Sequence, residues 1–349
     1  MTSNLLEVRD LRRHYGGRGW LGSVGNQVKA VDGVSLEVRR GETLAIVGES
    51  GCGKSTLARV IAGLDGATAG TVRISGQPVS ARGVSRRDVA RRVQIVFQDP
   101  FSSLNPRMRV EDIVAEPLEA QGMPREQRMQ RVAQLFESVG LPDEARRRLP
   151  HQFSGGQRQR IAIARALSVE PDLLVLDEPV SALDVSVRAQ ILNLLASLKR
   201  ERHISSVLIS HDMSAVQHLA DRVAVMYLGR LVEVGDAAQV FAEPAHPYTR
   251  TLLAAIPRLG GALPDASARV DVSPVPVSQG CSFAPRCSHA QPSCTEREPQ
   301  LAMPVDSTRW VRCHRVSELP PMNLAQETEP APGFTRRLAI LRRGLVTRQ

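Results

Sequence analysis

The sequence predicts an α/β fold in which a mostly parallel β-sheet is covered by helices on both faces. Short apolar runs at Thr43–Val47, Leu173–Leu176 and Val207–Ser210 have the length and composition of buried strands. Segments between them carry apolar residues at helical spacing. A glycine-dense turn joins the first strand directly to a helix near Ser55–Ala62. Strands that alternate with helices along a chain generally pair in parallel.

The remaining elements are expected in chain order from the same signals. Residues 5–15 predict a strand that ends at Tyr15, and the glycine-rich segment 16–25 predicts a loop. A helix is expected over 126–140, with stop signals at Gly140 and Pro142, and Val223–Tyr227 predicts a last short strand. Apolar stripes of two helices are expected in the core: Met129, Val132, Leu135, Phe136 and Val139, then Ile191, Leu194, Leu195 and Leu198.

Length and composition indicate a globular chain without membrane spans of its own. The 349 residues suffice for one large or two modest domains. A hydrophobic content of 42% and a charged content of 23% are ordinary for a soluble protein. No stretch approaches the ~18 consecutive apolar residues of a spanning helix, and the N-terminus lacks a signal-peptide pattern. We expect a cytosolic chain whose transmembrane partners are separate polypeptides.

The net charge of +9 raises the question of nucleic-acid or membrane contact. Of the 45 basic residues only three are lysines, and the arginines are spread over the whole chain. Aromatic residues make up only 3%, which leaves few platforms for stacking bases. We therefore expect no nucleic-acid partner. The last twenty residues, 330–349, hold five arginines and no acid; this tail could touch anionic lipid, but a solvated end is the preferred interpretation.

A phosphate-binding loop is the first motif that carries chemistry. The segment Gly48–Ser55 has the pattern G-x4-G-K-S and lies between a buried strand and a helix. Its glycines let successive backbone N–H groups point at phosphate oxygens, and the helix N-terminus adds its positive dipole end. Lys54 is expected to reach the β- and γ-phosphates and Ser55 to ligate Mg²⁺. The predicted nucleotide-binding residues here are Gly48, Ser50, Gly51, Gly53, Lys54, Ser55 and Thr56.

Two acids follow the apolar strand Leu173–Leu176. Asp177 is expected to hold Mg²⁺, directly or through water. Glu178, one position later, is predicted to polarise the attacking water. An apolar run followed by two acids is a weak signal alone, and it gains weight here from lying about 120 residues after the phosphate-binding loop.

A second anion cradle is expected where Ser154, Gly155, Gly156 and Gln157 open a helix. This Ser-Gly-Gly-Gln segment resembles the signature of ATP-binding cassette (ABC) ATPases, and other marks of that family occur in order. The resemblance implies that Tyr15 stacks on adenine, although an aromatic at a strand end is commonly a core residue. It also implies three further roles: a Mg²⁺-contacting Q-loop at Gln98, a D-loop ending at Asp184, and a γ-phosphate-sensing His211.

The resemblance extends to about residue 316 and narrows to the ATPase subunits of oligopeptide and dipeptide importers. The matching stretches are Gln98–Arg107, Asp177–Val185 and Pro244–Arg250. The last of these is typical of this subfamily. The intact signature together with Pro179–Asp184 resembles the second of the two ATPases that such importers use. Phe153 stands where many ABC proteins have Leu, as is common in this subfamily.

Four of the five cysteines lie close together, at Cys281, Cys287, Cys294 and Cys313. In a cytosolic protein such a cluster favours a metal site over disulfides. No pair has the short C-x2–4-C spacing usual for zinc. The spacing resembles the C-terminal module of peptide-importer ATPases, which implies a 4Fe–4S cluster, with Zn²⁺ as the alternative. His289 and His314 are interpreted as supporting or incidental, and Cys52 as a small side chain that fits the phosphate-binding loop.

The resemblance implies a RecA-like P-loop core with an antiparallel β subdomain and an inserted helical subdomain over 99–166. The expected organisation is an ABC domain at 1–259, a linker at 260–280, a cysteine-rich module at 281–320 and a basic tail at 321–349. The implied cofactors are ATP and Mg²⁺. The implied location is the cytoplasmic face of the inner membrane.

The implied partners are a second ATPase, two transmembrane permeases and an external peptide-binding protein. The second ATPase is either a paralogue or another copy of this chain, because one chain carries only one set of motifs. Import of nickel or glutathione is an alternative function. A soluble ABC ATPase acting on ribosomes or DNA is a weaker one, since such proteins carry two motif sets or a long coiled coil that this chain lacks.

Overall fold

The structure is a computed structural model that describes residues 4–16, 27–80, 84–255, 279–302, 309–320 and 322. The chain divides into two compact units, residues 1–231 and 232–349, and each is described by itself. Most of the predicted loop at 16–25 and of the linker at 260–280 lies outside the described residues, as does the tail at 321–349 apart from residue 322.

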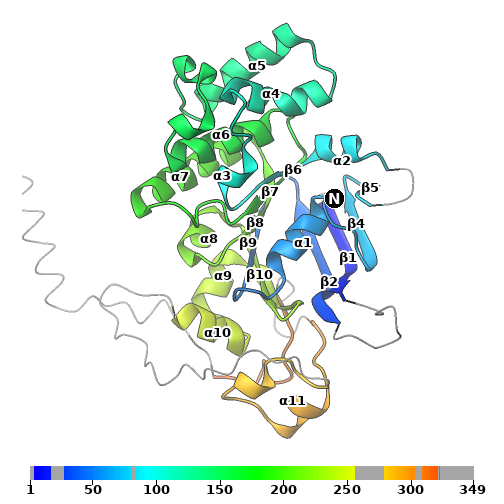
Figure 1. Cartoon of the computed structure of the whole chain (residues 1–349). Helices are drawn as coiled ribbons and strands as arrows, with labels where there is room; N and C mark the ends of the chain where they lie inside the picture. The colour runs from blue at the N-terminus through cyan, green and yellow to red at the C-terminus, as the bar shows by residue number, and fades with distance from the viewer. Residues whose placement is uncertain are drawn as a thin grey trace, which may run out of the picture. The chain divides into compact units, whose positions relative to one another are not determined.

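A parallel β-sheet forms the centre of the first unit. Its strands are β3 (Thr43–Val47), β6 (Val93–Val96), β7 (Leu173–Asp177), β8 (Ser205–Ile209) and β9 (Arg222–Tyr227), in the order β9-β3-β8-β7-β6 (Figure 1). All four pairings are parallel. Every residue of β3, β7 and β8 is buried, as their short, mostly apolar sequences predict for strands covered on both faces.

A second, antiparallel sheet completes the strand structure of this unit. It consists of β1 (Asn4–Tyr15), β2 (Val28–Arg39), β4 (Ala69–Ile74) and β5 (Gln77–Pro78), in the order β2-β1-β4-β5. Helix α1 (Lys54–Ile61) contacts β2 of this sheet as well as β7 and β8 of the parallel sheet. The phosphate-binding loop that precedes α1 is therefore anchored between two sheets.

The helices between β6 and β7 form a group of their own. They are α3 (Pro100–Ser103), α4 (Val110–Ala120), α5 (Arg125–Ser138) and α6 (Gly155–Leu167), with 3-10 turns at Asp143–Arg147 and Pro150–Gln152. Helices α4, α5 and α6 contact one another, and Figure 1 shows them gathered beyond β6 and β7. Val132, Leu135, Phe136 and Val139 are buried there, as their spacing predicts, whereas Met129 is only half-buried.

Three further helices complete the first unit: α2 (Arg86–Arg92), α7 (Val185–Arg202) and α8 (Met213–Leu219). Helix α7 contacts both α6 and α8. Its Ile191, Leu195 and Leu198 are buried. No helix among the described residues is both long and apolar enough to cross a membrane.

The second unit is smaller and less regular. It contains most of β10 (Arg230–Asp236), then α9 (Ala237–Ala242), α10 (Pro247–Ala254), a 3-10 turn at Ala284–Arg286, α11 (Pro292–Glu296) and β11 (Trp310–Val311). Strands β10 and β11 pair antiparallel. Fully buried Glu233 on β10 accepts hydrogen bonds from the backbone N–H groups of Ala245 and His246, at 3.0 and 2.9 Å. This contact joins β10 to the start of α10.

Candidate functional site

The candidate site lies along the carboxyl edge of the parallel sheet. Four neighbouring parallel strands, β3, β8, β7 and β6, end there, so the residues that follow them are brought to one edge. Such an edge is the usual ligand-binding position in open α/β sheets. The phosphate-binding loop follows β3, His211 follows β8, Asp177 and Glu178 follow β7, and Gln98 follows β6. The predicted catalytic residues are thus placed on adjacent strands.

Glycine backbone geometry shapes the phosphate-binding loop. Gly48 and Gly53 have φ values of 156° and 107°, and a Cβ atom on Gly53 would lie 1.9 Å from the carbonyl oxygen of Ala30. Helix α1 begins directly after Gly53 without a side-chain cap, so its first N–H groups are left for a phosphate. Lys54 is buried, and its ammonium group donates to the carbonyl oxygens of Gly48 and Glu49, both at 2.8 Å.

The residues expected to hold Mg²⁺ are in contact. The Ser55 hydroxyl donates to the Asp177 carboxylate at 3.1 Å, although the two residues are 122 positions apart. Burial raises the pKa of Asp177, while the Ser55 hydrogen bond and nearby Lys54 lower it. A hydroxyl and a carboxylate oxygen are ligands that Mg²⁺ prefers, so this pair fits the ion. Gln98 is exposed beyond β6, and its place in the ion's ligand set stays a prediction.

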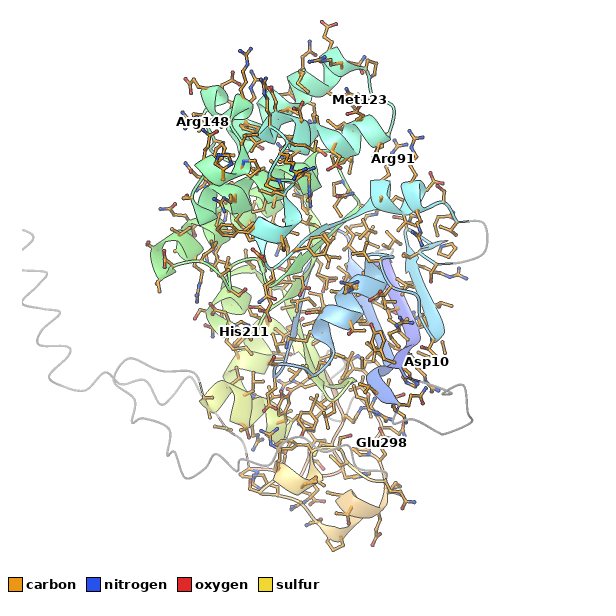
Figure 2. The ribbon with its side chains drawn as sticks, viewed as in Figure 1. Asp10, Arg91, Met123, Arg148, His211 and Glu298 are labelled. Carbon is orange, nitrogen blue, oxygen red and sulfur yellow. The ribbon has the colours of Figure 1, made fainter. Side chains whose placement is uncertain are left out.

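Glu178 and His211 form the second contact across the site. His211, labelled in Figure 2, has its Nδ1 atom 3.2 Å from a carboxylate oxygen of Glu178. Glu178 has a left-handed backbone, with φ of 49°, and its N–H donates to the Ile209 carbonyl at the end of β8. Backbone in this region is costly for a residue with a Cβ and is found preferentially at functional sites. The carboxylate is therefore held at the end of the sheet, next to the histidine.

Tyr15 ends β1, and 38% of its surface is exposed. Its hydroxyl donates to Asp65 at 3.4 Å, and the guanidinium carbon of Arg13 lies 4.5 Å from the ring centroid. Asp65 is also paired with Arg59 of α1. This partly exposed ring, tied to the helix that begins at the phosphate-binding loop, is suited to stacking on a base, and the alternative of a plain core aromatic is disfavoured.

The signature segment is built as a helix start. Ser154 accepts a hydrogen bond from the Gln157 N–H, and the Gln157 side chain accepts one from the Ser154 N–H. A Cβ on Gly156 would lie 2.3 Å from a methyl group of Val187 on α7, so this glycine lets α6 and α7 approach closely. In the described contacts the signature packs on α7, just after the D-loop residue Asp184, rather than on the phosphate-binding loop of the same chain.

Sequence reasoning missed several side chains that hold these motifs in place. Arg188 on α7 pairs with Asp212, the residue after His211, at 2.8 Å. Arg158 on α6 lies over the ring of Phe101 on α3, with its guanidinium carbon 3.9 Å from the centroid. No sequence periodicity links Arg158 to Phe101, because the two residues are 57 positions apart and lie in different elements. The only signal in the sequence is that Arg158 is a basic residue directly after the signature.

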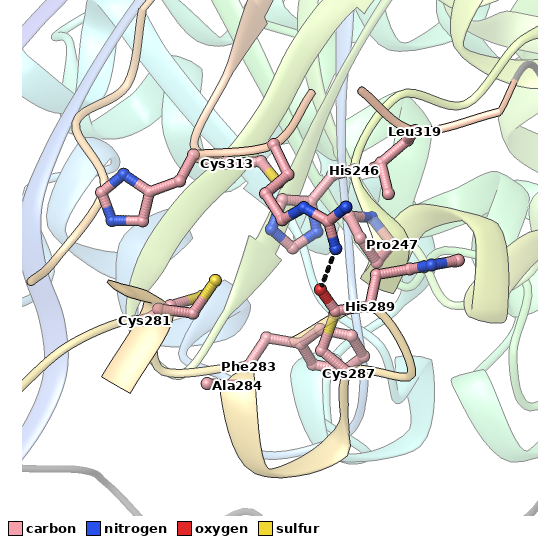
Figure 3. Close-up of a pocket in the computed structure, with 12 residues that line it drawn as sticks. His246, Pro247, Cys281, Phe283, Ala284, Cys287, His289, Cys313 and Leu319 are labelled. Atoms are coloured by element: carbon pink, nitrogen blue, oxygen red, sulfur yellow. Dashed lines mark hydrogen bonds between the residues drawn. The ribbon is translucent and has the colours of Figure 1, made fainter. Parts of the chain in front are cut away.

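In the second unit, the four late cysteines line one pocket. Its wall also includes His246, Phe283, His289, His314 and Arg315, and Figure 3 shows Cys281, Cys287 and Cys313 around the same space. The Cys281 N–H donates to the Cys294 carbonyl at 2.7 Å. Arg315 donates to the His289 carbonyl at 2.8 Å, the dashed contact in Figure 3. Burial raises the pKa of Cys281 and Cys287, and raises that of Cys313 to about 11.

The expectation of a formed iron–sulfur site is not met by these side chains. Among the described residues, no group of three or more His, Cys, Asp or Glu side chains is placed to hold a metal ion. The four predicted ligands line one pocket, but their side chains do not form a ligand set. The physical reason is that the direction of each sulfur depends on its side-chain rotamer and on what fills the pocket, neither of which the spacing of the cysteines determines.

Sequence profiles of known protein families match segments of both units. The sequence profile described as "ABC transporter" matches residues 31–181, and the one described as "Oligopeptide/dipeptide transporter, C-terminal region" matches residues 232–294. The dipeptide transport ATP-binding protein DppF of Escherichia coli strain K12 is 48% identical over 85% of this chain and 90% of its own. The putative oligopeptide transport ATP-binding protein YkfD of Bacillus subtilis strain 168 is 45% identical over 89% of this chain and 95% of its own.

Two solved structures share the fold. CbiO1 of Clostridium perfringens, part of the ABC transporter complex cbiONQ, has a TM-score of 0.59 and 30% identity. The match covers 68% of this chain and 90% of that protein. The ATP-binding cassette MJ0796, in a dimeric post-hydrolysis state with ADP and Pi, has a TM-score of 0.58 and 27% identity over 66% of this chain and 98% of its own.

Proposed function

Because the chain belongs to the family of ATP-binding proteins of oligopeptide and dipeptide ABC transporters, we propose that it binds and hydrolyses ATP to drive peptide uptake. The observation that carries this is the joining of Ser55 to Asp177 and of Glu178 to His211 at one sheet edge, next to the phosphate-binding loop. Together these residues supply a phosphate cradle, an oxygen-ligand pair and a base.

Each residue has a role that follows from its position. The N–H groups at the start of α1 and the Lys54 ammonium bind the phosphates. Ser55 and Asp177, with Gln98 as a further candidate, would hold Mg²⁺, which would offset the negative charge that develops on the transferred phosphoryl group. Glu178 accepts a proton from the attacking water. His211 contacts the Glu178 carboxylate and is placed to donate to the γ-phosphate. Tyr15 stacks on the base.

The proposed assembly places the chain on the cytoplasmic face of the membrane. Two permease subunits and a second ATPase subunit are its partners, with an external peptide-binding protein in the full importer. The helical segment 99–166 and Gln98 are proposed to dock the permeases. The intact motif set supports an active subunit.

Glu178→Gln tests the catalytic assignment. The amide keeps the shape of the side chain but cannot accept a proton, so ATP turnover should fall by ~10²–10⁴ while ATP binding is retained. Glu170→Gln is the matched control, because Glu170 also has a left-handed backbone, with φ of 50°, but lies on the exposed surface paired with Arg131. Turnover of the Glu178 variant within tenfold of the unchanged protein would assign the base to another residue.

We further propose that the four late cysteines hold a 4Fe–4S cluster with a structural role, Zn²⁺ being the alternative. The support is that all four line one pocket and that four thiolates are the usual ligand set of such a cluster. The sulfurs must be drawn together on binding, because the described side chains do not already form a metal-holding group. The cluster would then cross-link a segment too short to build a stable core unaided.

Iron, sulfide and zinc analysis of anaerobically purified protein tests this proposal. We expect brown protein with about four irons per chain. Cys287→Ser should lose the iron and destabilise the second unit while sparing ATP binding. Cys52→Ser, the change at the one cysteine outside the cluster, should keep the full iron content. Colourless protein with one zinc per chain would exclude the iron–sulfur cluster and retain a cysteine-held metal.

A further inference from the structure

Two arginines of α6 reach the short helix that follows Gln98. Arg158 and Arg165 are seven residues apart and therefore lie on the same face of α6. The Arg158 guanidinium lies over the Phe101 ring, 3.9 Å from its centroid. Arg165 donates to the Ser103 carbonyl at 2.7 Å. Both contacts fall on α3, which is only four residues long.

Arg158 is itself fixed on its other side. Its Nε donates to the Pro150 carbonyl at 2.8 Å and its Nη2 to the His151 carbonyl at 3.3 Å. These carbonyls belong to the turn that leads into the signature. A single side chain therefore ties together the turn before Ser154, the helix after it and the segment after Gln98. A planar guanidinium can stack and donate on its edge at once, which a lysine ammonium cannot do.

Helix α3 buries little of its own surface, although Leu104 just after it is buried and the helix contacts α6. Pro100 is its only buried residue, and Phe101 is 61% exposed. Its N-terminus is capped locally by Asp99, which accepts from the Phe101 N–H at 2.8 Å. Because the buried apolar surface is small, the two arginine contacts contribute to fixing the position of this helix on α6. Gln98 immediately precedes the cap, so the position of Gln98 follows that of α3.

We propose that Arg158 is a positioning residue that couples Gln98 to the signature through the ring of Phe101. The inference rests on the proposed function, in which Gln98 serves the nucleotide of its own chain. It adds that the signature at Ser154, which packs on α7 through Gly156, serves the nucleotide of the partner ATPase. The Arg158–Phe101 contact then makes the two elements move together. A change at one bound nucleotide would therefore shift the residue that completes the binding site of the other nucleotide.

The test measures ATP turnover against ATP concentration in the assembled transporter, for changes that remove or keep the ring face. Phe101→Leu keeps an apolar side chain but removes the aromatic face, and Arg158→Lys keeps the charge but removes the planar group. Each should lower turnover at saturating ATP about two- to fivefold, the factor that corresponds to one partly exposed cation–π contact. The Hill coefficient should fall towards one, with nucleotide affinity unchanged and the melting temperature lowered by no more than the loss of one such contact allows.

Phe101→Trp retains a ring face and should restore turnover and cooperativity. The double change of Phe101 to Leu and Arg158 to Lys should be no worse than either single change, because both remove the same contact. Arg131→Lys, on α5 and paired with exposed Glu170, is the control and should behave as the unchanged protein.

Single variants with normal turnover and cooperativity, or a double variant in which the two losses multiply, would overturn the coupling role. If turnover falls only in proportion to the loss of folded protein, as the melting temperature reports it, and Phe101→Trp does not restore it, the contact is purely structural. That result would also overturn the coupling role. Failure of the unchanged transporter to hydrolyse ATP would instead contradict the proposed function.

Discussion

At the residue scale, the nucleotide site depends on a backbone position that a side chain cannot share. Gly53 has φ of 107°, and an added Cβ would lie 1.9 Å from the Ala30 carbonyl oxygen on β2. Neither atom can yield without moving a strand or the start of α1. Because the first N–H groups of α1 bind phosphate by pointing at a fixed position, any such movement acts directly on nucleotide binding.

Gly53→Ala should therefore weaken ATP binding by about tenfold or more, the equivalent of losing one hydrogen bond to a charged group. Gly41→Ala is the matched control, since Gly41 also has positive φ, at 73°, but has nothing within 4 Å of the added Cβ. That control should lose roughly 1–2 kcal/mol of stability and keep its ATP affinity. Titration of a fluorescent nucleotide and thermal unfolding measure both effects; equal affinities for the two variants would contradict the steric argument.

At the element scale, the sequence was most informative where strands are wholly buried. The runs that became β3, β7 and β8 are mostly apolar and too short for a buried helix, so a buried strand is the element they predict. Strand β2 was missed because the charged residues Lys29, Asp32 and Glu37 interrupt its apolar residues, so it shows no apolar run, and its pairing with β1 is interrupted by bulges. Helix α4 was obscured by Pro117 within it.

The candidate site likewise combines residues that the sequence predicts with residues that it does not. Motif residues were predictable because phosphate and Mg²⁺ chemistry restricts both residue type and spacing. The side chains that position them, such as Arg158 and Arg188, make contacts set by how elements pack, and no local pattern encodes these contacts. For the same reason the cysteine spacing, from which a cluster was predicted, did not determine the directions of the four sulfurs.

We expect the stability of helix α10 of the second unit to depend on pH through His246 at its N-terminus. His246 is its N-cap, and the Nδ1 atom accepts from the Tyr248 N–H at 3.0 Å. Burial lowers the pKa of His246 to about 3, well below its unfolded value near 6.5. The unfolded chain therefore binds a proton more readily than the folded one. The stabilising contribution of neutral His246 is complete above about pH 6.5 and is lost as the pH falls towards 3.

His246→Asn should isolate this effect, because asparagine caps helices well but does not titrate. At pH 7.5 the variant should be the less stable protein, since it loses the ring contact with Phe283. The difference should shrink as the pH falls to 5. Comparing the two proteins also removes the separate contribution of Glu233, whose pKa is raised by burial. Hydrogen exchange of the α10 amides reports the local opening; a constant difference across this pH range would contradict the titration of His246.

At the scale of the whole molecule, we propose that the signature of the second ATPase adds to the groups that one chain supplies around each nucleotide. The phosphate-binding loop lies at the sheet edge, whereas the signature packs on α7 through Gly156 and Val187. The first-turn N–H groups of α6 carry no acidic neighbour in that turn, so they remain suited to an anion supplied from elsewhere. A head-to-tail pair of chains would bring each signature to the other's phosphates and close both sites.

Two variants separate the halves of this composite site. Ser154→Asp keeps a capping oxygen for the Gln157 N–H but adds a negative charge that repels phosphate. It should leave the chain's own ATP affinity unchanged and abolish turnover, whereas Lys54→Ala should lose both. If the purified chain hydrolyses ATP alone, it pairs with itself, and mixing the two inactive variants should restore about a quarter of the original turnover. Half of the dimers are then mixed, and each mixed dimer has one intact site of its two. The contrary result is an unchanged chain that is active alone, with two inactive variants that recover no turnover after subunit exchange. It would place the signature and the phosphate-binding loop of one chain in the same site and would contradict the head-to-tail arrangement.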